Sequence, residues 1–276
     1  MPTIALLQMN SGIVAEDNLA QIERACEEAA GKGAAILFTP EMSVLLDRDR
    51  RRAARWIERG GPEAAAEKLA GWARHYGIDI ALGSMPVPAG EGRWANRSIY
   101  FSHEAGRAAS YDKIHMFDVD LSTGESWHES KAYRPGERVV TVPGTAIGRL
   151  GLAVCYDMRF PALFEALGRQ RCDAIAVPAA FTRPTGEAHW HVLLRARAIE
   201  ASGFVIAAAQ VGAHADGRET YGHSLVVDPW GEVLLDMGGD APGLGLCEID
   251  LDRIDAVRAQ VPSLANRREI ANWTAA

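Results

Sequence analysis

The stretch Leu150-Gly-Leu-Ala-Val-Cys-Tyr-Asp-Met-Arg-Phe-Pro161 is an apolar run that stops at a cysteine, after which the chain turns polar before a proline. Such a run predicts a buried strand, and the thiol of Cys155 then lies at the strand's end, open to substrate on one side. The backbone N–H groups that follow, starting at Tyr156, are free to face developing negative charge. Because cysteine also packs often as a small hydrophobe, this stretch alone leaves a nucleophile and a buried structural thiol both open.

Charged side chains occur at two other predicted strand ends. The segment Ala35-Ile-Leu-Phe-Thr-Pro-Glu41 is typical of a buried strand that ends in a carboxylate, and Tyr111-Asp-Lys-Ile-His-Met-Phe117 places Lys113 just after a strand. Taken singly, Glu41 could begin a solvated loop and Lys113 could be an edge-strand charge that blocks unwanted pairing. Each charged residue therefore indicates a catalytic site only in combination with the thiol.

These three residue types match what amide hydrolysis through a thiol requires. The thiol needs a base, the departing nitrogen needs an acid, and one carboxyl group whose pKa is raised by burial can serve as both in turn. An ammonium group beside the N–H of Tyr156 would supply two donors to the oxyanion, and losing one such donor costs about 2.7 to 4 kcal/mol of barrier. The set predicts Glu41 as the acid and base, Lys113 as the oxyanion donor and Cys155 as the nucleophile.

Six segments in a fixed order form a recognisable set: Thr39-Pro-Glu-Met42, Asp112-Lys-Ile-His115, Gly151-Leu-Ala-Val-Cys-Tyr-Asp-Met-Arg-Phe-Pro161, Pro184-Thr-Gly-Glu-Ala-His-Trp190, Arg195-Ala-Arg-Ala-Ile-Glu200 and Tyr221-Gly-His-Ser-Leu-Val-Val-Asp-Pro-Trp-Gly231. Through these segments the sequence resembles the nitrilase or carbon-nitrogen hydrolase superfamily, whose triad is Glu-Lys-Cys, over nearly the whole chain. It is most similar to the branch that contains deaminated glutathione amidase and omega-amidase.

The resemblance also implies a second glutamate near the lysine. The candidates are Glu125, Glu129 and Glu137, and the stretch Glu129-Ser-Lys-Ala-Tyr-Arg-Pro-Gly136 best matches the family's Glu-Ser before a Pro-Gly turn. We expect Glu129 in this role, with Glu125 as the alternative. A loop carboxylate paired in solvent with Lys131 or Arg134 is the structural explanation for the same residue.

Substrate preference turns on Arg159, four positions after the thiol. An arginine can hold a carboxylate through two parallel hydrogen bonds, which suits an acid whose far end carries the scissile amide. In the resembled amidases the residues that match Arg159, Phe181 and Thr185 contact the substrate's acid end, and we expect Tyr156 to contact substrate through its N–H. An ion pair of Arg159 with Asp157 or Glu165 is the competing interpretation.

The histidines do not predict a metal site or a catalytic base. On a helix, His189 and His191 are two residues apart and point to different faces, so they cannot share one ion. We expect His189 to orient the active-site loop, and His115 and His223 to be structural hydrogen-bonding groups. No metal and no cofactor are implied.

Composition is consistent with one compact enzyme domain over residues 1–276. A net charge of −7 gives no basic footprint for nucleic acid, and we interpret the arginine-rich segment 48–55 as a solvated helix face. No apolar run approaches the roughly 18 residues of a membrane span, and no secretion signal is visible. The four cysteines show no close paired spacing, which favours a reducing cytoplasm.

Strand and helix patterns alternate along the chain, which favours a layered α/β protein with two sheets packed face to face and helices outside. The superfamily's fold is this four-layer α-β-β-α sandwich. Strands are expected at 3–8, 34–38, 78–82, 98–101, 108–111, 147–154, 174–177, 204–209, 223–227, 232–236 and 244–249, and helices at 17–31, 62–76, from 162 and at 189–201.

In relatives, helices near the nucleophile pair across a two-fold axis. Here the apolar residues Leu163, Phe164 and Leu167, with the helix from Val192 to Ile199, could form such a face, so we expect a homodimer or a larger homo-oligomer. The alternative is that these residues only pack onto the sheet.

The resulting prediction is a thiol-dependent amidase without cofactor. It would cleave the C–N bond of a small carboxylate-bearing amide, either deaminated glutathione or a 2-oxo-acid omega-amide, to acid and ammonia through a thioester. The same triad would serve N-carbamoyl amino acids, aliphatic amides or nitriles. A non-catalytic scaffold of this fold and a Cys-His hydrolase of another fold are the remaining alternatives.

Overall fold

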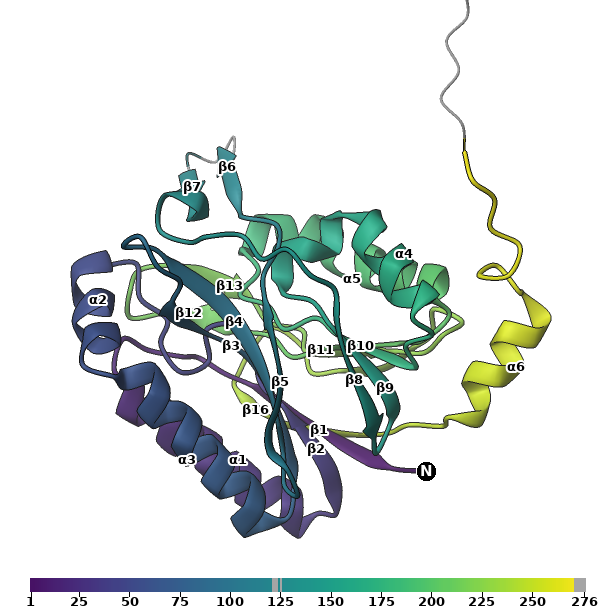
Figure 1. Ribbon diagram of the computed structural model, residues 1–276, viewed down its shortest axis with the longest axis horizontal. Coiled ribbons are helices and arrows are strands. Elements are labelled where there is room, and N and C mark those ends of the chain that lie inside the picture. Colours follow the sequence, from purple (N-terminus) through teal and green to yellow (C-terminus); the bar gives the residue numbers. More distant parts are fainter. Residues whose placement is uncertain (121–123, 125, 271–276) are drawn as a thin grey trace, which may run out of the picture.

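The computed structural model describes residues 1–120, 124 and 126–270, and its core is a pair of six-stranded sheets (Figure 1). The first sheet has the strand order β16-β1-β2-β3-β4-β5. Its strands are β1 (Thr3–Gln8), β2 (Ala34–Phe38), β3 (Asp79–Pro88), β4 (Trp94–Ser102), β5 (Gly106–Asp112) and β16 (Gly243–Glu248). β1, β2 and β3 run parallel, β16 and β4 pair antiparallel with this group, and β5 pairs antiparallel with β4.

The second sheet repeats this plan, with the order β15-β14-β11-β10-β9-β8. Its strands are β8 (Val140–Thr145), β9 (Gly148–Leu152), β10 (Ala174–Ala176), β11 (Phe204–Ala207), β14 (Leu225–Val227) and β15 (Val233–Asp236). β9, β10 and β11 are parallel, β8 and β14 pair antiparallel with this group, and β15 pairs antiparallel with β14. In each sheet, therefore, parallel strands deliver their carboxyl ends to one edge.

Alternating side chains along β1 show how the layers stack. Ile4 and Leu6 pack with the second sheet, whereas Ala5 and Leu7 pack against helices on the opposite face. The sheets thus face each other across one apolar layer, and helices cover the outer surfaces. This arrangement confirms the predicted α-β-β-α sandwich.

Helices α1 (Ala15–Gly31), α2 (Arg50–Glu58) and α3 (Gly61–Tyr76) accompany the first sheet, and α4 (Pro161–Arg169) and α5 (Arg183–Ala201) cover the second (Figure 1). Two small two-stranded sheets, β6 (Asp118–Asp120) with β7 (Ser126–His128) and β12 (Val211–Ala213) with β13 (Glu219–Tyr221), lie in the connections. Short 3-10 helices occur at Glu129–Lys131 and Cys155–Arg159.

The structure differs from the sequence prediction in several places. β1 and β2 have the predicted bounds, but the prediction omits α2, both small sheets, β8 and the last helix, α6 (Asp252–Gln260). No helix in the described ranges is both long and apolar enough to cross a membrane. The predicted contact face on α4 is internal, because Leu163, Phe164 and Leu167 are buried in the chain's own core, whereas Val192 and Ile199 on α5 are 68% and 50% exposed.

Candidate active site

Three segments that follow strands bring the predicted triad together. Glu41 comes three residues after β2, Cys155 comes three residues after β9, and Lys113 directly follows β5. Because β2 and β9 are central parallel strands of facing sheets, their carboxyl ends project their loops toward one shared space. All three side chains line one cavity of about 220 Å³.

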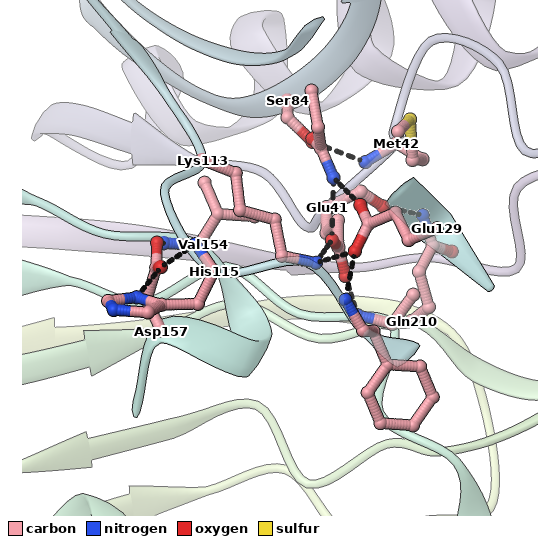
Figure 2. A network of polar contacts seen from close by, with 12 residues as sticks. Glu41, Met42, Ser84, Lys113, His115, Glu129, Val154, Asp157 and Gln210 are labelled. Atoms are coloured by element: carbon pink, nitrogen blue, oxygen red, sulfur yellow. Dashed lines mark hydrogen bonds and ion pairs between the residues drawn. The ribbon is translucent and has the colours of Figure 1, made fainter. Parts of the chain in front are cut away.

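Lys113 is held between two carboxylates. Its Nζ donates to Glu41 Oε1 at 3.0 Å and to Glu129 Oε2 at 2.8 Å, as Figure 2 shows. The ammonium group is buried, and although burial opposes its charge, Glu129 and Glu41 raise the pKa of Lys113 well above its ordinary value. Glu129 therefore occupies the place expected for the second glutamate, and Glu125 lies outside the described residues.

Glu41 has a lowered pKa, whereas the sequence argument expected burial to raise it. Burial does push the pKa upward, but Lys113, the Cys155 thiol and the N–H of Ala180 all stabilise the carboxylate and bring its pKa below the ordinary 4.5. The Ala180 N–H donates to Glu41 Oε2 at 2.9 Å. In the resting site Glu41 is thus ionised and ready to accept a proton.

Cys155 is a buried, protonated thiol at a strained turn. Burial, followed by the charge of Glu41, raises its pKa well above 9.0, and the thiol donates a hydrogen bond to that carboxylate. The backbone of Cys155 is left-handed, with φ of 47°, and conformations of this kind in non-glycine residues cost about 1–3 kcal/mol and cluster at active sites. Its N–H donates to Pro178 O at 2.9 Å, while the next N–H, of Tyr156, has no acceptor among the described residues. That free donor is what the oxyanion prediction needs.

Asp157 fixes the thiol's turn to the lysine's strand. Its carboxylate is fully buried and accepts from the N–H of Val154 at 2.9 Å and from the Tyr111 hydroxyl at 2.7 Å. The other oxygen meets His115 twice, through the backbone N–H at 3.0 Å and Nδ1 at 2.7 Å (Figure 2). Tyr111 and His115 flank Lys113 in the sequence, so one side chain sets the position of the nucleophile against that of the lysine.

Two further residues of the site were not predicted from the sequence. Asn96, buried in β4, donates through Nδ2 to Glu41 Oε1 at 2.8 Å and to Glu129 Oε1 at 3.1 Å. Tyr133 lines the same cavity, and burial followed by the charge of Glu129 raises the pKa of its hydroxyl. Neither has a motif around it, and an asparagine inside a strand that otherwise reads as buried is the only hint for Asn96.

Three of the four predicted substrate-contacting residues line the cavity, and the fourth does not. Tyr156, Phe181 and Thr185 line the cavity, but Arg159 is not among its lining residues. Arg159 donates instead toward His189 at 3.2 Å, and its guanidinium carbon lies 5.3 Å from the centroid of the Phe181 ring. Neither competing ion pair forms, because the carboxylate of Asp157 pairs with His115 and that of Glu165 with arginines other than Arg159.

Three arginines that the sequence did not single out for the site line the cavity. Arg48 and Arg50 belong to the segment interpreted as a solvated helix face, and Arg218 lies between β12 and β13. α2 begins only at Arg50, so Arg48 sits in the loop that leads from Glu41 to the helix. The helical interpretation is confirmed from Arg50 onward and is wrong for Arg48.

Each histidine that the sequence singled out contacts a group other than the thiol. His189 contacts Arg159, and His115 contacts Asp157. His191 and His223 both hydrogen-bond to Asp236 at 2.9 Å, an acidic partner that the sequence did not reveal. Cys155 therefore faces a carboxylate and not an imidazole, which argues against a Cys-His dyad.

Comparison with known proteins agrees with the fold. Residues 3–259 match the carbon-nitrogen hydrolase family. The chain is 41% identical to deaminated glutathione amidase of Yersinia enterocolitica over 98% of this chain and 94% of that protein. The NitFhit protein of C. elegans superposes with a TM-score of 0.87 at 35% identity, and the match covers 97% of this chain and 65% of that one.

The NitN amidase of Nesterenkonia sp. AN1 superposes with a TM-score of 0.82 at 27% identity, over 97% of each chain. Two solved structures of a Glu-to-Gln mutant of the amidase from Nesterenkonia sp. AN1 show additions at the active-site cysteine, one by Michael addition of acrylamide and one of the acetamide moiety of fluoroacetamide. The fold and the site define a hydrolase of non-peptide carbon-nitrogen bonds that acts as an amidase. The chain belongs to the carbon-nitrogen hydrolase family.

Proposed function

We propose that this amidase hydrolyses small carboxylate-bearing amides through a thioester on Cys155, with deaminated glutathione or a 2-oxo-acid omega-amide as substrate. The observation that carries the proposal is the buried group of Glu41, Lys113 and Glu129 beside the thiol in one cavity. The names of the relatives favour deaminated glutathione within this class.

In the first half-reaction, Glu41 takes the thiol proton as sulfur attacks the amide carbon. The Lys113 ammonium and the Tyr156 N–H stabilise the tetrahedral oxyanion, and Glu41 then gives its proton to the departing nitrogen as the C–N bond breaks. The products of this half are the thioester and the free amine or ammonia. Glu129 and Asn96 hold Lys113 and Glu41 in place throughout.

In the second half-reaction, Glu41 acts as base again. It takes a proton from a water molecule that attacks the thioester carbon, and collapse of the second tetrahedral intermediate expels the Cys155 sulfur, which regains a proton from Glu41. The acid is released and the site returns to its starting protonation. All proton transfers pass through one carboxyl group, which matches the sequence prediction of its double role.

The leaving group depends on which substrate is correct. The sequence prediction names ammonia, which an omega-amide releases. The amide bonds of glutathione are secondary, so cleavage of its deaminated form at such a bond releases an amine instead. An assay that follows only ammonia would miss this reaction.

A substrate panel with two trapping variants tests the proposal. Deaminated glutathione, 2-oxoglutaramate and 2-oxosuccinamate are compared at matched concentrations by chromatography of the acid and amine products. Cys155→Ala should lose turnover while keeping the thermal unfolding temperature within a few degrees. Glu41→Gln should also lose turnover, and mass spectrometry should show whether its thiol still adds acrylamide, as in the mutant Nesterenkonia enzyme. Full activity of Cys155→Ala would overturn the mechanism.

A further inference from the structure

Two guanidinium groups share one aromatic ring at the wall of the active-site cavity. The guanidinium carbon of Arg48 lies 4.4 Å from the centroid of the Trp127 ring, and that of Arg218 lies 5.1 Å from the same ring. All three residues line the cavity that holds Cys155. They come from three separate segments: the loop before α2, strand β7 and the turn between β12 and β13.

Most carboxylates close to this wall are already paired. Asp216 binds Arg218 at 2.7 Å and Asp47 binds Arg52 at 2.5 Å, while Glu219 binds Arg183 at 2.7 Å. Asp47 and Glu219 themselves line the cavity, but each is paired with an arginine, Arg52 or Arg183, that lies outside its lining.

Arg48 forms no ion pair with any residue in the described part of the chain. Arg50 donates to the backbone carbonyl oxygens of Lys131 and His128, at 3.1 and 3.4 Å. The wall thus carries an excess of positive charge, whereas the inner site around Lys113 carries two carboxylates and one ammonium.

Each guanidinium is attracted to the face of the Trp127 ring, and a carboxylate that reaches both would add charge-assisted hydrogen bonds. Arg48 has all its N–H groups available to a carboxylate, whereas Arg218 gives Nε and Nη2 to Asp216 and has only Nη1 without a partner among the described residues. The indole Nε1 of Trp127 is buried and has no hydrogen-bond partner within residues 1–120, 124 and 126–270, so a further donor belongs to the same wall.

We infer that Arg48 and Arg218, stacked on Trp127, form a subsite for a carboxylate of the substrate that lies away from the scissile amide. The inference rests on the proposed amidase function and names the groups that select an acidic amide. It moves the acid-binding role from Arg159, which contacts His189 and the rings of Tyr156 and Phe181 but does not itself line the cavity, to Arg48 and Arg218 on the cavity wall.

A matched pair of substrates isolates this subsite. Glutaramate and valeramide have the same chain length and the same primary amide, but valeramide has a methyl group in place of the carboxylate. The wild-type protein should have a higher kcat/KM for glutaramate. Arg48→Gln and Arg218→Gln should each raise the KM for glutaramate by about 10- to 100-fold, the value of a charge-assisted hydrogen bond, with a small change in kcat.

Three further variants sharpen the comparison. Arg218→Lys keeps the charge but loses the fork geometry, so its KM should fall between those of the wild-type and Arg218→Gln proteins. Arg51→Gln removes the same charge from an exposed position outside the cavity and should leave the ratio of kcat/KM for the two amides unchanged. If Arg159→Gln lowers this ratio and Arg48→Gln and Arg218→Gln do not, the subsite is misplaced.

Binding of glutarate, the product acid, gives a readout that does not require turnover. Calorimetry should show weaker glutarate binding by Arg48→Gln and Arg218→Gln in proportion to their KM values, and thermal unfolding would verify that each variant is folded. If the wild-type protein hydrolyses neither amide yet binds glutarate through both arginines, the amidase proposal fails and the subsite stands. If it hydrolyses both amides equally well, or if glutarate binding ignores both arginines, the subsite is refuted and the amidase proposal survives.

Discussion

Replacing Asp157 with asparagine should show whether this buried carboxylate stabilises the fold, positions Cys155 for catalysis, or does both. The side chain is fully buried and accepts four hydrogen bonds, two on each carboxylate oxygen, from the Val154 N–H, the Tyr111 hydroxyl and His115. Asparagine keeps the shape of the side chain but has an NH2 group in place of one carboxylate oxygen. The two hydrogen bonds to that oxygen are lost, and the NH2 group then faces the donors that made them. At roughly 1.5 kcal/mol or more for each bond to a charged group, the free energy of unfolding should fall by about 3–6 kcal/mol.

The same change should reduce turnover, because Asp157 ties the turn of Cys155 to the strand of Lys113. A displacement of about 1 Å between reacting groups costs on the order of 100-fold in rate. We therefore expect kcat of Asp157→Asn to fall by about 100-fold with a smaller change in KM, since the cavity residues that contact substrate are not altered. His115→Ala should reproduce part of the effect by removing one donor.

Urea unfolding and steady-state kinetics measure the two effects. Asp240→Asn is the matched control, because Asp240 is exposed and makes no ion pair with another described residue. Wild-type stability and wild-type kcat in Asp157→Asn would refute the positioning role. A stability loss with unchanged kcat would show that Asp157 supports the fold without setting the nucleophile.

Three more measurements test the electrostatics and the assembly. The kcat/KM should rise with pH as Glu41 ionises, with a midpoint below pH 4.5 because the pKa of Glu41 is lowered. It should then stay level, because the raised pKa of Cys155 keeps the thiol protonated up to and beyond pH 9.0. An acid limb centred near pH ~6.5, where histidine titrates, would contradict the assignment of Glu41 as the base. Lys113→Met removes an oxyanion donor and the cation that lowers the Glu41 pKa, so kcat should drop by about 100- to 1,000-fold and any residual activity should show an acid limb at higher pH. Sedimentation should show at least a dimer at micromolar concentration, and Val192→Glu with Ile199→Glu should dissociate it, whereas a monomeric wild-type protein would remove the proposed interface.

The fold could be predicted largely because strand and helix patterns are local. β1 and β2 each carry an uninterrupted apolar run, and the helix α1 repeats its buried residues at helical spacing. The last helix, α6, was missed because its hydrophobic pattern is weak: only Ile254 and Val257 are buried. Short strands such as β12 and β13 carry too few residues for a period to show.

Residues of the site could be predicted where chemistry coincides with a strand end. Glu41 and Cys155 meet that condition, and the parallel strands bring them to one edge. The position of Asn96 gave no such indication, because its partners lie 55 and 33 residues away in the sequence. Arg48 looked like part of a helix face, and only the start of α2 at Arg50 shows that it belongs to the cavity wall.

The pKa of Glu41 is the one point at which a local argument gave the opposite direction, and its correction clarifies the mechanism. With the carboxylate stabilised by Lys113, the resting state keeps the proton on Cys155, and transfer to Glu41 occurs only as sulfur attacks and negative charge moves onto the substrate oxygen. The proton that Glu41 then carries is held weakly, because the neutral carboxyl group gains less than the carboxylate from the ammonium beside it. A weakly held proton is readily given to the departing nitrogen, so the contact that makes Glu41 a modest base in the first step makes it a strong acid in the next. Burial alone would have raised the pKa of Glu41, so that the neutral carboxyl group would be the stable form and would give its proton to the departing amine slowly.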